Sequence, residues 1–170
     1  MVENEIKIGD QTWTRRNLDV SKFRNGDVIP QVQDLEEWKN LSTGAWCYYE
    51  NDTENGTTYG KLYNWYAVND PRGLAPKGYH IPTDAEWTIL TDNLGGEANN
   101  DHYMRFAGLP GGCRDYDGDF ANIGAFGNWW SSSENNTSYA LYRDLGSNSG
   151  NVSRFSNYKR NGFSVRCLRD

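Results

Sequence analysis

The stretch Pro82 to Gly95, PTDAEWTILTDNLG, carries the strongest helix signal in the chain and separates two unlike halves. Thr83 can accept a hydrogen bond from the backbone of Glu86, whose side chain can return one, and this reciprocal pattern is typical of a helix start. Glycine then follows as a helix stop. The apolar positions that share one helical face are Trp87, Leu90 and Leu94. A helix over residues 84–94 is therefore expected, with this face on the core.

The sequence before this helix predicts short strands and short helices. Ile6–Ile8 and Gln11–Thr14 flank a Gly-Asp pair, which predicts a hairpin with a two-residue turn. Asp34 is a suitable N-cap for a helix near residues 34–41, where apolar side chains recur at helical spacing. Three further segments are expected as a buried strand, a polar loop and a weaker helix, in this order: 44–49, 50–58 and 62–68.

After residue 106 the pattern changes to short strands joined by Gly- and Asn-rich turns. Trp129 and Trp130 are adjacent on one such strand, so their rings should point to opposite faces and at least one should enter the core. Gly162–Leu168 alternates Phe, Val and Cys with Ser and Arg, which predicts a half-buried strand. We expect a single α+β domain over residues 1–170, with two short helices and a mixed, mostly antiparallel sheet.

Composition favours a folded binding domain and excludes several other classes. The 170 residues are 36% hydrophobic but 14% aromatic, so large rings must carry much of the burial. A net charge of −6 with scattered Lys and Arg argues against nucleic-acid binding, which needs a basic surface. No apolar run reaches the roughly 20 residues that span a bilayer, and Met1–Lys7 shows no signal-peptide pattern. We expect a monomer that neither binds nucleic acid nor inserts into a membrane.

Several phrases of the sequence are similar to those of one family, the Fibrobacter succinogenes major paralogous domain. They occur in order over nearly the whole chain: Gly9–Trp13, Arg16–Leu18, Gly44–Tyr49, Tyr59–Val68, Pro76–Pro82, Asp84–Trp87, Leu109–Gly112, Trp129–Ser132 and Gly162–Cys167. The resemblance implies a C-type-lectin-like fold, in the variant shared with formylglycine-generating enzymes. It also implies a relation to the variable target proteins of diversity-generating retroelements, in which asparagine codons near the 3′ end are rewritten. Such a domain is expected to be extracellular or displayed on a cell or virion surface.

The codon rule of these retroelements can be checked in the sequence itself. An asparagine codon randomised at both adenines never encodes Lys, Glu, Gln, Met or Trp. Residues 1–134 contain 26 residues of these types, a rate that predicts about seven in residues 135–170, where only Lys159 occurs. A Ser-, Asn- and Gly-rich region of strands and turns also lacks helix formers, which explains part of the depletion. Residues 135–161 contain six Asn, five Ser and three Tyr, a composition typical of antibody contact loops.

These patterns predict a scaffold over residues 1–134, a variable ligand-binding region over about 128–161 and a terminal scaffold strand over 162–170. Alternate side chains of a strand share a face, so supporting and contacting residues should interleave. The family resemblance indicates a supporting role for Leu141, Arg143, Leu145, Val152, Arg154 and Lys159. The predicted ligand contacts are Tyr142, Asp144, Ser147, Ser153, Phe155, Ser156, Asn157, Tyr158 and Arg160. Phe155 and Tyr158 would be the aromatic anchors, unless Phe155 packs inward.

Enzymatic activity is the first alternative, because the implied fold resembles that of formylglycine-generating enzymes, which hold copper with paired cysteines. Here Cys47, Cys113 and Cys167 are far apart in the sequence. Cys47 and Cys167 are expected as buried thiols or as a bonded pair. His80 and His102 each lie beside an aromatic residue and form no evident catalytic set. We expect no catalytic residue, no metal ligand and no cofactor.

A carbohydrate-binding or structural surface module without diversification is the second alternative. The Glu-Pro-Asn and Trp-Asn-Asp phrases of sugar-binding C-type lectins do not occur. Asp115–Asp119 has carboxylates at alternate positions, as a calcium loop needs, but Phe120 stands in the place of the EF-hand glycine. A solvated turn is therefore expected there.

Overall fold

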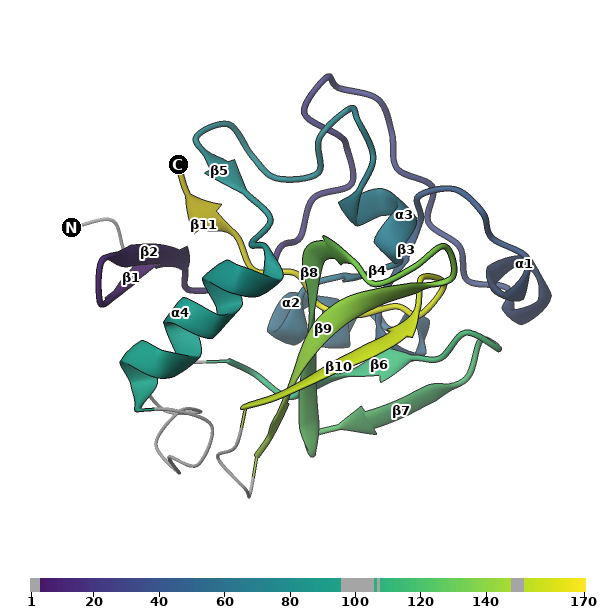
Figure 1. Ribbon diagram of the computed structural model, residues 1–170. Coiled ribbons are helices and arrows are strands. Elements are labelled where there is room, and N and C mark those ends of the chain that lie inside the picture. The colour runs from purple at the N-terminus through teal and green to yellow at the C-terminus, as the bar shows by residue number, and fades with distance from the viewer. Residues whose placement is uncertain (1–3, 96–105, 107, 148–151) are drawn as a thin grey trace.

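The computed structural model describes residues 4–95, 106, 108–147 and 152–170, and within these it contains three sheets and four α-helices. The four helices lie between residues 35 and 94, and the chain after them is rich in strands (Figure 1). The predicted α+β class is therefore confirmed. No helix in the described parts of the chain is long and apolar enough to cross a membrane.

A four-stranded sheet brings the two ends of the chain together, in the order β1 (Glu5–Ile8), β2 (Gln11–Thr14), β11 (Leu168–Arg169) and β5 (Tyr79–His80). The first two strands form the predicted hairpin, and Gly9 supplies the positive φ of 59° that its turn requires. Leu168 pairs with Trp13 on one side and with His80 on the other. The first and last strands are thus close together, as expected (Figure 1).

A five-stranded sheet dominates the second half. Its strands, in spatial order, are β10 (Val152–Tyr158), β9 (Tyr139–Gly146), β8 (Phe126–Glu134), β6 (Gly111–Arg114) and β7 (Phe120–Ile123). All neighbours are antiparallel except β6 and β8, which pair in parallel. The mixed, mostly antiparallel arrangement agrees with the prediction.

The two strongest helix signals form helices with the expected caps. In α4 (Asp84–Leu94), Thr83 and Glu86 make the reciprocal capping bonds, and Gly95 ends the helix at a φ of 110°. In α1 (Leu35–Lys39), the Asp34 carboxylate accepts a hydrogen bond from the Glu37 backbone. α4 contacts β1, β8 and β9, so it joins the terminal sheet to the five-stranded one.

The described residues contain four α-helices, where two were expected for the domain, and one of the additional helices lies in a segment predicted to be a loop. The turn η1 (Tyr49–Asn51) and the helix α2 (Thr53–Tyr59) replace the loop expected over residues 50–58. Gly56 packs so closely against the Tyr48 ring that a Cβ atom on residue 56 would lie 2.3 Å from the ring carbons. This tertiary contact stabilises a segment of Thr, Asn and Gly, whose helix propensity is low.

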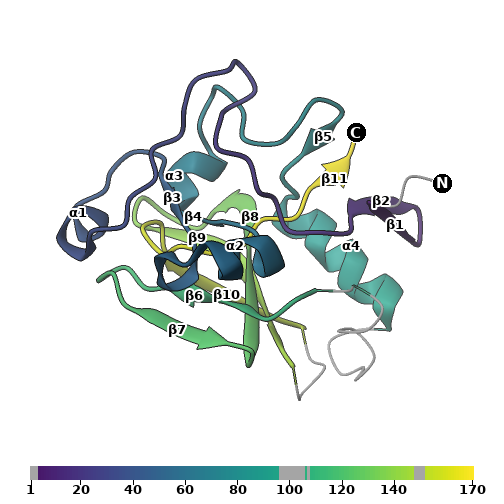
Figure 2. The ribbon, with the colours of Figure 1, turned by 180° about the vertical axis from the view of Figure 1, so that it is seen from behind.

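The segment 62–68, expected as one short helix, divides into a strand and a helix. β4 (Leu62–Tyr63) pairs with β3 (Trp46–Cys47) in a two-stranded sheet. α3 (Trp65–Val68) follows, with Asn64 as its N-cap, and it contacts β8. Figure 2 shows α2 and α3 from behind.

Both faces of β8 are buried, because its two tryptophans enter different clusters. The Trp129 ring lies 5.7 Å from that of Phe106, in a cluster that also contains Trp13 and Trp87. The Trp130 ring lies 4.4 Å from that of Phe163 on the other side. The prediction that at least one ring enters the core is confirmed, and both do.

The terminal segment Gly162–Leu168 is buried throughout, so the expected half-buried strand is wrong. It runs between other strands: Phe163 pairs with Tyr63, and Ser164 pairs with Trp129. Its polar residues are enclosed as well, because the Arg166 guanidinium stacks 4.1 Å from the centre of the Phe106 ring. The alternation of apolar and polar residues does distinguish two faces of this segment, but both faces are buried.

Candidate functional site

The β9–β10 ladder places five of the nine predicted contacts on the face opposite the predicted supporting residues. Cross-strand partners share a face, and the pairing joins Tyr142 to Phe155, and Asp144 to Ser153. We call this side the front face; in these two strands and β8 it comprises the fully buried Ala140 and Trp130 together with Asn128, Tyr142, Asp144, Ser153, Phe155 and Asn157. The opposite side is the back face, which comprises Leu141, Arg143, Leu145, Val152, Arg154 and Ser156.

The back face is fixed to α4 by one carboxylate. Arg143, whose side chain is 3% exposed, donates from Nη1 to Asp84 Oδ1 at 2.5 Å and from Nη2 to the Asp84 carbonyl at 3.0 Å. Its cross-strand partner Arg154 donates from Nε to both oxygens of the same carboxylate, at 3.0 and 2.9 Å. Asp84 therefore joins the first turn of α4 to two adjacent strands.

The residues predicted to support the scaffold are buried, with one exception. Leu141, Leu145, Val152 and Arg143 are enclosed on the back face, and Lys159 is enclosed at the end of β10. The exception is Arg154, whose side chain is 50% exposed although it is paired with Asp84.

The front face presents aromatic and polar side chains. Phe155 is 51% exposed, so the alternative in which it packs inward is wrong. Its ring centre lies 6.0 Å from that of Tyr142, which in turn packs 4.6 Å from the buried Phe163. Tyr142 is thus half-buried between the core residue Phe163 and the exposed Phe155 ring.

The other four predicted contacts lie outside the front face. Ser147 follows β9, and Ser156 is exposed on the back face. The Tyr158 ring stacks between two other tyrosine rings, those of Tyr116 and Tyr139, with centres 4.5 Å from each. Arg160 donates to the Lys39 carbonyl at 2.6 Å.

A hollow of about 360 Å³ adjoins Tyr158 and Arg160 and connects the tail to the loop after α1. Its lining also contains Asn40, Leu41, Ser42, Tyr66, Thr137, Ser138 and Lys159. The Lys159 ammonium is not available to a ligand there, because it binds the Glu134 carboxylate and the Thr137 carbonyl.

The front face continues onto β6 and the turn after it, which the sequence did not indicate. Cys113 contacts Asp115 at 3.7 Å between sulfur and Oδ1. Burial, together with the nearby charges of Asp144 and Asp115, raises the pKa of Tyr142 to about 12. Tyr142 therefore lies within electrostatic reach of Asp144 on its own strand and of Asp115 in the turn after β6. The alternation Cys113-Arg114-Asp115 is a signal that could have placed the first and third on one face.

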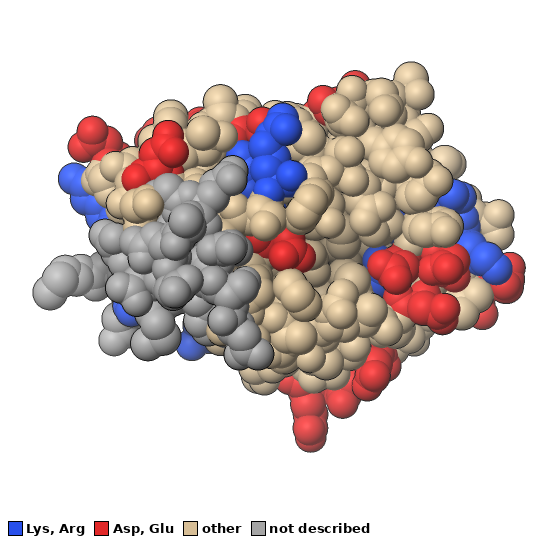
Figure 3. All heavy atoms as spheres, turned by 60° about the horizontal axis from the view of Figure 1, so that its bottom comes forward, with Lys and Arg blue, Asp and Glu red and all other residues tan. Residues whose placement is uncertain are grey.

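Both carboxylates of this surface are half-buried. Burial raises the pKa of Asp144, against a hydrogen bond from Asn128 Nδ2 at 2.8 Å that lowers it. Burial also raises the pKa of Asp115, with a further contribution from the charge of Asp117. Figure 3 shows the molecule from the side of β7 and β10, where a broad area of uncharged side chains has acidic groups in its middle and along its margins.

The three cysteines are free and buried, so the bonded pair that the sequence left open is wrong. Cys47 and Cys167 belong to different apolar clusters. Burial raises the pKa of all three thiols, including Cys113, to about 12. At neutral pH these are protonated, unreactive thiols.

The described residues contain no group of three His, Cys, Asp or Glu side chains that could hold a metal ion. The Asp115–Asp119 stretch forms the turn between β6 and β7, closed by a bond from the Asp115 amide to the Asp119 carbonyl at 2.7 Å. His80 bridges Glu86 and Asp170 at 3.0 and 2.9 Å. His102 lies outside the described residues.

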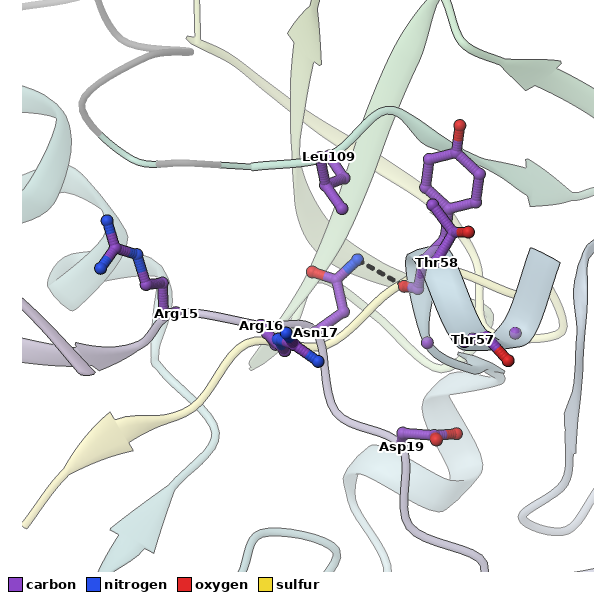
Figure 4. Close-up of a pocket in the computed structure, with 10 residues that line it drawn as sticks. Arg15, Arg16, Asn17, Asp19, Thr57, Thr58 and Leu109 are labelled. Carbon is purple, nitrogen blue, oxygen red and sulfur yellow. Dashed lines mark hydrogen bonds between the residues drawn. The ribbon is translucent and has the colours of Figure 1, made fainter. Parts of the chain in front are cut away.

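A second cavity, of about 340 Å³, lies between α2 and the segment after β2 (Figure 4). Its central polar group is Asn17, which donates to the Tyr59 carbonyl at 2.8 Å and accepts from Trp129 Nε1 at 2.8 Å. The Asp19 carboxylate at its edge is paired with Lys61. These groups already have partners within the fold, and none of the predicted ligand contacts lines the cavity.

The comparison with known families agrees with the resemblance noted in the sequence. The profile of the Fibrobacter succinogenes major domain matches residues 6–106. No curated protein matches the chain. The matched region contains the hairpin and all four helices and ends before β6, so the front face follows it in the sequence. The chain belongs to the Fibrobacter succinogenes major domain family.

Proposed function

We propose that this chain is a ligand-recognition domain with a C-type-lectin-like fold, that a diversity-generating retroelement diversifies its front face, and that it catalyses no reaction. The observation that carries the proposal is the division of the β9–β10 ladder. On the back face Leu141, Leu145 and Val152 pack on the core and Arg143 and Arg154 pair with Asp84, whereas five front-face residues are partly or largely exposed: Tyr142, Asp144, Ser153, Phe155 and Asn157. A surface of this kind can change its chemistry while the fold stays the same.

The one residue of the tail that the codon rule forbids supports this reading. Lys159 is buried, its ammonium binds Glu134, and it lies 4.8 Å from the centre of the Trp65 ring. It therefore has a structural task and is not part of the contact surface. All nine predicted contacts are residue types that a randomised asparagine codon can encode.

Surface display outside the cell, as a monomer with a macromolecular or cell-surface partner, belongs to the same proposal. Nucleic acid is an unsuitable partner because the net charge is −6 and the front face carries carboxylates.

A carbohydrate-binding module without diversification is the second candidate, and the tyrosine row Tyr116, Tyr158 and Tyr139 favours it. Exposed aromatic rings can stack on sugars. Here, however, the rings lie 4.5 Å apart at interplanar angles of 48° and 32°, so each neighbouring pair already covers part of its ring faces. This row is better suited to edge contacts with a protein surface.

Two matched libraries test the division between the faces. In the first, the nine predicted contacts are randomised with asparagine-derived codons; in the second, the six supporting positions are. Displayed clones are treated with protease, which removes unfolded proteins. We expect most clones of the first library to survive, because exposed substitutions usually cost within about 0.5 kcal/mol each, and few of the second.

Loss of most clones in the first library would show that these residues are core and would refute the proposed contact surface. The retroelement itself is tested in the neighbouring DNA. A near-identical template repeat beside a reverse-transcriptase gene is expected, with its adenines aligned to the codons of the front face.

A further inference from the structure

We propose that the front face binds a positively charged side chain, an arginine or lysine of a protein partner, between Asp144 and Asp115. This inference rests on the proposed function and names the partner chemistry of the same surface. Three observations support it: the hydrogen-bonding groups of the face, the lack of a neutralising cation among the described residues, and the aromatic rings beside Asp144.

The polar groups at the centre of the face are mostly acceptors. Asp144 receives one side-chain hydrogen bond, from Asn128 Nδ2. Asn128 is only 5% exposed, and its Oδ1 accepts no hydrogen bond from the part of the chain that the structure describes. From the described residues, the Asp115 carboxylate receives only the weak thiol contact of Cys113. A ligand group with several donors and no acceptor matches this set, and guanidinium and ammonium are such groups.

No cation of the described chain neutralises the two carboxylates. Neither Asp144 nor Asp115 takes part in any ion pair among the described residues. The basic groups of the adjacent strands are engaged elsewhere. Arg143 and Arg154 bind Asp84 on the back face, and Arg114 donates to the carbonyls of Gly118, Val32 and Gln33.

Half-buried carboxylates without a cationic partner are unfavourable in the free protein, because burial removes water that would solvate the charge. A cation from a partner would offset that cost, whereas a phosphate or carboxylate ligand would be repelled. The Cys113 thiol, which lies near both carboxylates, adds no charge of its own. Burial, with a contribution from Asp115, raises the pKa of this thiol to about 12, so it stays protonated.

The aromatic side chains of the front face indicate that its ligand is a protein segment and not an isolated cation. Tyr142 and Phe155 border Asp144 across the ladder, and rings of this kind attract guanidinium and ammonium groups over their faces. Phe155 is 51% exposed, and its ring centre lies 6.0 Å from that of Tyr142. The apolar surface is therefore wider than one side chain, and a peptide loop with a central basic residue fits it best.

Peptide selection tests the inference without a known ligand. A display library of short disulfide-cyclised peptides is selected on the intact protein, and the winners are measured against Asp144→Asn, Asp115→Asn and Asp119→Asn. The last variant is the matched control, because Asp119 is exposed at the end of the same turn. We expect winners rich in Arg and Lys, with binding weakened about tenfold or more by the first two variants only, as for a lost charge-assisted hydrogen bond.

Replacement of the basic residue of a winning peptide by norleucine should give a similar loss. Thermal melts of each variant show whether it is folded. Winners that lose binding in Phe155→Ala but contain no basic residue, and that bind Asp144→Asn normally, would refute this inference and leave the proposed contact surface intact. Winners indifferent to Phe155→Ala and to both aspartate variants would count against the contact surface as well.

Discussion

Replacement of Asp84 by alanine should destabilise the protein far more than replacement of its exposed partner Arg154. Asp84 is 20% exposed and Arg143 is 3% exposed, so the substitution leaves a buried guanidinium with only the residue-84 carbonyl and the Thr88 hydroxyl as partners. Removing one member of a buried pair costs about 3–5 kcal/mol. Because Asp84 retains some access to water, we expect about 3 kcal/mol.

The Arg154 pair is half-exposed, and pairs of this kind contribute at most about 1 kcal/mol. Urea unfolding should therefore separate Asp84→Ala from Arg154→Ala by about 2 kcal/mol or more, the difference between the two estimates. For a protein of this length, a loss of about 3 kcal/mol lowers the Tm by roughly 6–12 °C.

A second variant tests the cause. Asp84→Ala combined with Arg143→Met removes both charges and replaces the guanidinium with an apolar side chain of similar length, so it should recover much of the loss. A cost below about 1 kcal/mol for Asp84→Ala, or no recovery in the double variant, would contradict the reasoning that one carboxylate fixes the back face.

Three further outcomes are expected. The three thiols should not react with a thiol reagent at pH 8 in the native protein and should all react in urea, since burial raises their pKa to about 12. Burial opposes protonation of His80, but hydrogen bonds to Asp170 and Glu86 outweigh this effect and raise the pKa of the histidine above 6.5. The free energy of unfolding, compared with that of His80→Gln, should therefore be highest below pH 6.5 and should decline as the pH rises through the raised pKa. Burial raises the pKa of Asp144, which disfavours its charged form in the folded state; Asp144→Asn should therefore be more stable than the parent at pH 7, and the difference should vanish below the ordinary value of 3.8.

The elements that could be predicted from the sequence are those whose signals lie within a few residues. The N-terminal hairpin has its turn glycine, and α4 has Thr83, Glu86 and Gly95. The helix α2 has a local cap in Asp52, but its stability also depends on the contact between Gly56 and Tyr48, which no local pattern reveals. Periodicity also says nothing about what covers each face, so the terminal segment 162–168 was expected to be half-exposed.

The same distinction applies to the candidate site. Alternation along one strand separates Tyr142 from Arg143, because it needs only the two-residue period. The position of Asp115 beside this face depends on the order of strands in the sheet, in which β6 is a neighbour of β8 although it precedes β7 in the chain. Lys159 is a case in which the sequence indicates an unusual residue but not its role. Only its contacts with Glu134 and Trp65 in the structure explain why a lysine is present there.

The front face combines residues on two sides of the proposed boundary between scaffold and variable tail. Asp115 belongs to the scaffold, whereas Asn128, Asp144 and Phe155 lie within the expected variable region 128–161. If the tail is rewritten, Asp115 remains in every version, and the residue at 144 decides whether a second carboxylate stands opposite the first. Versions that keep an acidic residue there should retain affinity for basic peptides, and versions with Ser or Tyr should lose it while melting at similar or higher temperatures. The burial of Asp144 then destabilises the free protein but places a charge that selection can keep or remove. The fold does not depend on the residue at this position.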